Sequence, residues 1–99
     1  MKKVVINPPV VEPTVTLSEA NPRKYYGILS LYEGKGFIKQ EKFESGPYQG
    51  ICSNGLTKGN AWGAFQDTSL PGLFGKIFDR GYSIFEFDSP QELFKWLSE

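Results

Sequence analysis

The sequence predicts an α+β fold: an antiparallel four- to five-stranded meander sheet with two helices on one face, preceded by an extended, proline-rich N-terminal arm. Three observations predict it. Four of the seven prolines lie in residues 1–22, apolar and polar residues alternate in the middle of the chain, and apolar residues recur at helical spacing near its end. We therefore divide the chain into an arm, residues 1–22, and a single α+β domain, residues 23–99.

The arm combines prolines with β-branched residues. Pro8, Pro9 and Pro13 each fix φ at about −65° and lack a backbone donor, which favours an extended arm or an edge strand. The valines around them add strand propensity. A chain terminus is ordered only when it packs against another part of the structure. The sequence leaves open whether the arm packs against its own domain or against another chain.

The meander is predicted within residues 23–67. Runs rich in β-branched and aromatic residues predict strands at Lys24–Glu33, Phe37–Glu44, Tyr48–Ser53 and Ala61–Gln66. Turns are expected at Gly34-Lys35-Gly36, at Ser45-Gly46-Pro47 and from Asn54-Gly55 onward. Gly27 lies inside a predicted strand, which indicates a bulge, a bend or the close approach of another part of the chain.

Residues 68–99 are predicted to form a helix, a strand and a second helix. The first helix has one apolar face, made of Leu70, Leu73, Phe74, Ile77 and Phe78. Ser69 is its expected N-cap, and Gly81 follows its end. Tyr82–Asp88 alternates as a strand. Ser89-Pro90-Gln91-Glu92 is a capping box with proline at the first helical position, which predicts a helix over Pro90–Ser98.

The composition excludes several classes of function. The 99 residues include no histidine and a single cysteine, Cys52, so the chain cannot form a Cys/His zinc site, a histidine-based catalytic triad or a histidine general base. No apolar run reaches the ~18–20 residues that span a bilayer, and no signal peptide opens the sequence. We therefore expect a non-enzymatic, cytoplasmic protein with no cofactor, no metal and no membrane contact.

Three carboxylates and the cysteine are the remaining candidates for chemistry. Glu86 and Asp88 lie on one face of a predicted strand and, with Asp67, would suit Mg²⁺. A polar strand end that leads into the next helix cap is the favoured interpretation. Cys52 has no charged neighbour to stabilise a thiolate, which favours a small buried side chain.

Protein binding is the leading functional prediction. The chain contains 2 Trp, 5 Tyr and 8 Phe, more than a small core easily hides, and aromatic side chains anchor interfaces. If both helices cover one sheet face, the other face needs a cover. We expect a protein partner or a second copy of the chain to bind Tyr26, Ile28, Tyr32, Trp62, Val10 and Val15. The protein could be an inhibitor or an assembly component, for example an accessory protein of a phage or mobile element. This suggestion rests on the small size of the chain and not on any residue.

A single-stranded nucleic acid is the second candidate ligand. The central part of the chain is mildly basic and aromatic, and such surfaces bind single strands by base stacking and phosphate contacts. The residues that would do so are Lys24, Lys35, Phe37, Lys39 and Lys42. The net charge of +0 for the whole chain counts against this alternative.

A small-ligand or nucleotide pocket is the third candidate. Thr68, Ser69, Gly72 and Gly75 lie around the expected start of the first helix. Free backbone N–H groups there attract anions, and glycines allow close approach. Pro71 removes one of these donors, and neither of the common glycine-rich phosphate-binding motifs occurs in the chain.

Overall fold

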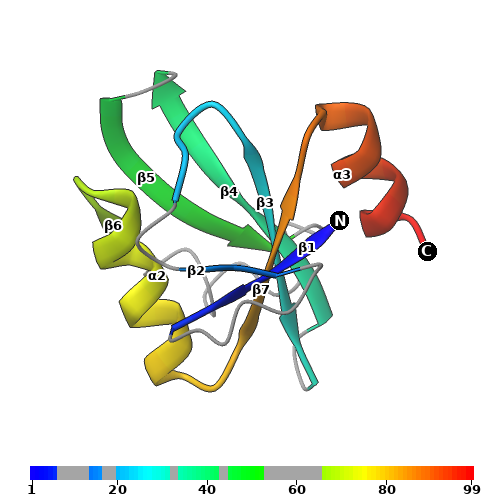
Figure 1. Cartoon of the computed structure of the whole chain (residues 1–99), viewed down its shortest axis with the longest axis horizontal. Helices are drawn as coiled ribbons and strands as arrows, with labels where there is room; N and C mark the ends of the chain where they lie inside the picture. Colours follow the sequence, from blue (N-terminus) through cyan, green and yellow to red (C-terminus); the bar gives the residue numbers. More distant parts are fainter. Residues whose placement is uncertain (7–13, 17–19, 32–33, 43–44, 53–65) are drawn as a thin grey trace.

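The computed structural model describes residues 1–6, 14–16, 20–31, 34–42, 45–52 and 66–99, with the backbone alone described at 39–42, 45–47, 51 and 52. These residues form a seven-stranded sheet and two helices (Figure 1). In chain order the elements are β1 (Lys2–Val5), β2 (Thr14–Thr16), β3 (Tyr25–Ser30), β4 (Gly34–Lys42), β5 (Ser45–Cys52), β6 (Gln66–Asp67), α2 (Leu70–Asp79), β7 (Ser83–Phe87) and α3 (Pro90–Leu97). The α+β class is confirmed.

The sheet is larger than predicted and is mixed. Its strand order is β2-β1-β7-β3-β4-β5-β6. β1 pairs antiparallel with β7 and parallel with β2, so segments that the sequence assigned to an extended arm are strands at one side of the sheet. The described parts of residues 1–22 are thus held by their own chain. The prolines at positions 8, 9 and 13 lie outside the described residues.

The β3–β4 hairpin turns earlier than the sequence predicts. Gly34 and Gly36 were expected in the turn, but they pair with Ser30 and Ile28 as the first residues of β4. Gly34 has a φ of +82°, a left-handed conformation that glycine adopts without steric cost. The conformational freedom of Gly34 therefore allows the chain to enter β4 at this residue. The predicted strand Ala61–Gln66 lies outside the described residues except for Gln66, where β6 begins.

Both helices begin at the predicted caps. The Ser69 hydroxyl accepts a hydrogen bond from the Gly72 N–H at 3.0 Å, and the Ser89 hydroxyl accepts one from the Glu92 N–H at 3.2 Å. These bonds satisfy backbone donors that a helix leaves free in its first turn. After α2, Gly81 has a φ of +81°, as expected beyond a helix end. Local capping signals therefore locate both helices correctly.

The two helices lie on opposite faces of the sheet, not on one face as predicted (Figure 1). α2 buries Leu70, Leu73, Phe74 and Ile77 against the core side chains Val4, Tyr26, Ile28, Ile38, Tyr48 and Ile84. α3 contacts the other side of β3 and β7, where Gly27, Phe85 and Phe87 meet it. Successive side chains of a strand point to opposite faces, and here both faces are apolar. We call these sides the α2 face and the α3 face.

Gly75, inside α2, gives a first test of this packing. A Cβ at Gly75 would have no heavy atom within 4 Å, so alanine adds helix propensity without a clash. We expect Gly75→Ala to raise the free energy of unfolding by about 0.5–1 kcal/mol in urea denaturation. Gly72→Ala is the matched control, because its Cβ would lie 2.6 Å from Asp67 Oδ2 and 2.7 Å from Ser69 Oγ. Loss of stability in Gly75→Ala would contradict the described packing of α2.

Candidate functional site

Trp96 is the centre of the α3 face. Its ring lies directly on the backbone of Gly27, where a Cβ would come within 2.9 Å of the ring atom Cε3. The ring also packs against Phe85 and Phe87, at centroid distances of 5.6 and 5.5 Å. The aromatic contacts fix the position of α3 on β3 and β7, and the missing side chain at Gly27 makes room for them.

Lys35 holds the C-terminal end of α3. Its Nζ donates hydrogen bonds to the carbonyl oxygens of Trp96 at 2.7 Å and Glu99 at 3.4 Å. The same ammonium lies 4.7 Å from the centroid of the Trp96 ring. Carbonyls at a helix C-terminus carry partial negative charge, and aromatic faces attract cations. The positive charge of Lys35 therefore holds the end of α3 against β4.

An exposed aromatic side chain lies beside this cluster. Phe94 of α3 is 57% exposed and meets Phe37 of β4 edge to face, with ring centroids 6.5 Å apart. The neighbouring exposed residues are polar: Gln91 and Lys95 of α3, and Ser98, which follows it. The outer side of α3 thus has an apolar centre within polar surroundings, as protein interfaces do.

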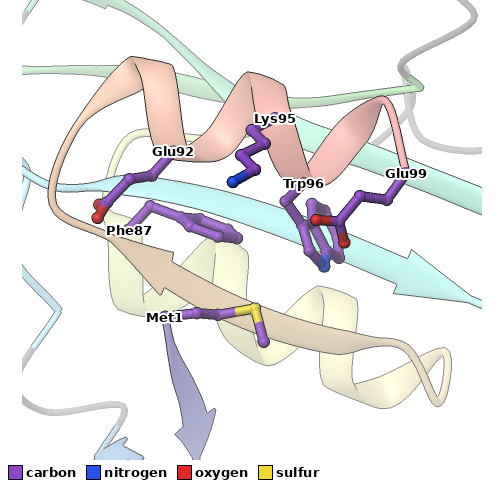
Figure 2. A pocket seen from close by; sticks show the side chains of 6 residues that line it. All are labelled: Met1, Phe87, Glu92, Lys95, Trp96 and Glu99. Atoms are coloured by element: carbon purple, nitrogen blue, oxygen red, sulfur yellow. The ribbon is translucent and has the colours of Figure 1, made fainter.

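A pocket of about 290 Å³ opens between α3 and the start of β1. It is lined by Met1, Phe87, Glu92, Lys95, Trp96 and Glu99. Met1 precedes Lys2, which pairs with Glu86 in β7, and this register brings Met1 beside Phe87. Figure 2 shows Lys95 between Glu92 and Glu99 above the apolar side chains. The pocket therefore combines an aromatic floor with a charged rim.

The α2 face contains a buried polar pair. The Tyr26 hydroxyl donates to Glu86 Oε2 at 2.8 Å and accepts from the Asn21 N–H at 2.9 Å. Tyr26 is 1% exposed and Glu86 7%. Burial, together with the adjacent Glu86 carboxylate, raises the pKa of Tyr26 far above its usual value. The neutral phenol is therefore the form that this core accommodates.

The predicted partner-binding residues are not gathered on a surface. Tyr26 and Ile28, at 1% and 0% exposure, lie in the core beneath α2, so the prediction that they face a partner is wrong. Among the described elements, α2 covers the face on which a partner was expected, and α3 covers the opposite face. Val15 is partly buried against the same core. Val10, Tyr32 and Trp62 lie outside the described residues.

The residues predicted to bind nucleic acid have contacts within the chain. Lys24 Nζ lies 2.7 Å from Asp88 Oδ1, and this hydrogen bond raises the pKa of Lys24 and lowers that of Asp88. Lys35 binds the end of α3, and Phe37 packs on Phe94, as described above. The side chains of Lys39 and Lys42 lie outside the description. The described lysines of this set therefore have acceptors in their own chain.

The first turn of α2, where a ligand pocket was predicted, is occupied by the chain itself. Asp67 Oδ1 accepts from the Ser69 N–H at 2.9 Å, and Asp67 Oδ2 lies 3.2 Å from Lys76 Nζ. These contacts lower the pKa of Asp67, the Ser69 N–H contributing most. A second anion here would meet an ionised carboxylate. Thr68 is exposed and Gly75 lies further along the helix, away from these donors.

The three carboxylates considered for Mg²⁺ have separate partners. Asp67 pairs with Lys76, Asp88 with Lys24, and Glu86 with the Tyr26 hydroxyl. Among the described residues no group of three metal-ligating side chains occurs. In the same residues no helix is long and apolar enough to cross a membrane.

Sequence reasoning missed the contribution of Phe94 and Trp96. Two signals pointed toward them: a glycine inside a strand at Gly27, and a last helix that is apolar on most of its circumference. Read together, they indicate a large side chain packed on the glycine.

The chain matches no known protein family, no curated protein and no solved structure.

Proposed function

We propose that the protein is a non-enzymatic interaction module that binds a protein partner through the outer side of α3 and the adjacent Phe37. Phe94 carries the proposal, because it is more than half exposed and is fixed in place by a helix and by contact with Phe37. Aromatic side chains of this kind, central to a polar rim, anchor interfaces. The proposal keeps the predicted class of function and moves its surface from the α2 face to the α3 face.

The charged groups support a binding role over a catalytic one. Asp67, Asp88 and Glu86 each have a contact that stabilises the fold. Asp67 acts at the start of α2, Asp88 pairs with the residue before β3, and Glu86 binds Tyr26 in the core. A protein partner is also favoured over nucleic acid, because Lys24 and Lys35 already have acceptors within the chain. The identity of the partner would then decide between an inhibitor and an assembly component.

Phe94→Ser tests this proposal against a matched control, Leu31→Ser. Leu31 is 94% exposed but lies outside the Phe37–Phe94 contact. We expect Leu31→Ser to unfold within about 0.5 kcal/mol of the wild type, as surface substitutions do. Phe94→Ser should lose about 1 kcal/mol with its contact to Phe37 and stay folded. The protein that copurifies with the wild type is identified by mass spectrometry, and its affinity is then measured with both purified components.

The expected result is a loss of at least about tenfold in affinity for Phe94→Ser, typical of an interface anchor, with no change for Leu31→Ser. A stoichiometric partner that binds Phe94→Ser as tightly as the wild type contradicts the proposal. So does the lack of any stoichiometric protein partner, a second copy of the chain included.

A further inference from the structure

We propose that the pocket between α3 and β1 receives an uncharged, apolar side chain of the protein partner, such as a leucine. In this arrangement the partner's side chain lies on Met1 and Trp96, beside the segment that packs on Phe94. This inference rests on the proposed protein-binding function and names the chemistry of one partner contact.

The pocket has an accessible apolar base. Phe87 and Trp96 pack together there, with ring centroids 5.5 Å apart, and Met1 faces them (Figure 2). Met1 is 61% exposed, so its side chain offers apolar surface that the fold itself does not bury. Methionine adapts to the shape of a neighbour and packs well beside aromatic rings. A partner's apolar side chain can therefore bury both its own surface and that of Met1.

The charged groups that line the pocket balance one another. Glu92 and Glu99 supply two carboxylates. Two positive charges stand against them: Lys95, which lies between the two glutamates in Figure 2, and the α-ammonium of Met1. The rim therefore has no excess of either sign to attract a charged side chain.

A third cation near the pocket, Lys35, already has acceptors. Its ammonium lies 4.7 Å from the centroid of the Trp96 ring and donates to the carbonyl oxygens of Trp96 and Glu99. These carbonyls carry the partial negative charge of a helix C-terminus, which offsets the charge of Lys35. A charged side chain entering the pocket would lose hydration without an opposite charge left to receive it. An apolar side chain gains from burial instead.

The size and position of the pocket suit one side chain of the same partner. Its volume of about 290 Å³ is at the small end of the roughly 300–1,000 Å³ typical of sites for whole ligands. Lys95 belongs both to the rim of the pocket and to the polar surroundings of Phe94. A partner segment that covers Phe94 therefore meets the pocket directly beside it.

An NMR titration with four Nα-acetyl amino acid amides tests the inference. Met1 is the only methionine of the chain, so a label on its methyl group reports on the pocket. We expect the leucine compound to shift the Met1 methyl and Trp96 indole signals with an affinity at least about fivefold higher than the asparagine compound, which has a similar shape but a polar side chain. The lysine and glutamate compounds should both bind more weakly than the leucine compound.

Two variants test whether the charges contribute to binding. Lys95→Gln and Glu99→Gln each remove one charge from the rim. A neutral side chain has no net charge for the rim to attract, so both variants should bind the leucine compound within about twofold of the wild type. A larger change in either variant would contradict an uncharged occupant.

No shift of the Met1 methyl signal with the leucine compound overturns the inference, and so does equal binding of the leucine and asparagine compounds. Tighter binding of the lysine or glutamate compound overturns it as well, because charge would then select the occupant. Phe94→Ser should leave the titration unchanged, since Phe94 does not line the pocket. A failed titration beside intact Phe94-dependent partner binding rejects the pocket inference alone, whereas partner binding that does not depend on Phe94 rejects the proposed function.

Discussion

Gly27→Ala is expected to lower the free energy of unfolding by roughly 3 kcal/mol, at the upper end for overpacked sites. The added methyl group would overlap the six-membered part of the Trp96 ring, with Cε3 only 2.9 Å away. That ring cannot retreat easily, because Phe85, Phe87 and Lys35 all contact it. The substitution should therefore displace α3 and expose the aromatic side chains beneath it.

A double-mutant cycle with Trp96→Ala separates this clash from any other effect of alanine in the strand. Trp96→Ala alone should cost about 3–5 kcal/mol, the usual range for removing a large aromatic side chain from a packed site. In that background Gly27→Ala should cost less than about 1 kcal/mol, because its methyl group then has room. Equal costs of Gly27→Ala in the two backgrounds would mean that Trp96 does not lie on Gly27.

Tyr26→Phe is the second substitution with a large expected effect. It removes the hydroxyl that donates to Glu86 and accepts from the Asn21 N–H, which leaves a carboxylate that is 7% exposed without this donor. We expect a loss of about 2–3 kcal/mol in urea denaturation at pH 7, since unsatisfied buried charges cost more than neutral groups. Tyr26→Phe combined with Glu86→Leu should recover part of it, because both polar groups are then gone.

The pH dependence of stability gives an independent check on Tyr26. Its pKa is raised in the folded protein, so its contribution is complete below the pKa of an unfolded tyrosine, about 10. Above that pH the unfolded chain releases the proton while the folded chain retains it, and stability falls. The gap in stability between the wild type and Tyr26→Phe should therefore shrink between pH 10 and 12. A constant gap over this range would show that Tyr26 is not a buried, protonated donor.

Local signals in the sequence are sufficient to predict the helices. Ser69 and Ser89 cap them as predicted, because a cap depends on residues within one turn of each other. The strands are less well predicted. The turn assigned to Gly34–Gly36 is part of β4, since a glycine with positive φ can end a turn as well as occupy its centre.

The side of the sheet that each helix covers depends on distant residues. In β3, Tyr26 and Ile28 alternate with Gly27, and both sides of β7 are apolar as well. The alternation of residues along the strands therefore could not show which helix covers which face of the sheet. For this reason Tyr26 was predicted to face a partner. Phe94 was missed as an exposed residue for the same reason. Its exposure follows from Trp96 docking on Gly27, a contact between the two halves of the chain.

The nuclear Overhauser effect between Trp96 and Gly27 tests the central claim most directly, because the proposed surface depends on how α3 docks. With the ring on the glycine backbone, we expect strong cross-peaks from Trp96 Hζ3 and Hε3 to the Gly27 α-protons. These α-protons should also be shifted upfield by the ring, and both signals should vanish in Trp96→Ala. Unshifted Gly27 α-protons without these cross-peaks would mean that α3 docks elsewhere, and the surface around Phe94 and the pocket beside Trp96 would both be lost.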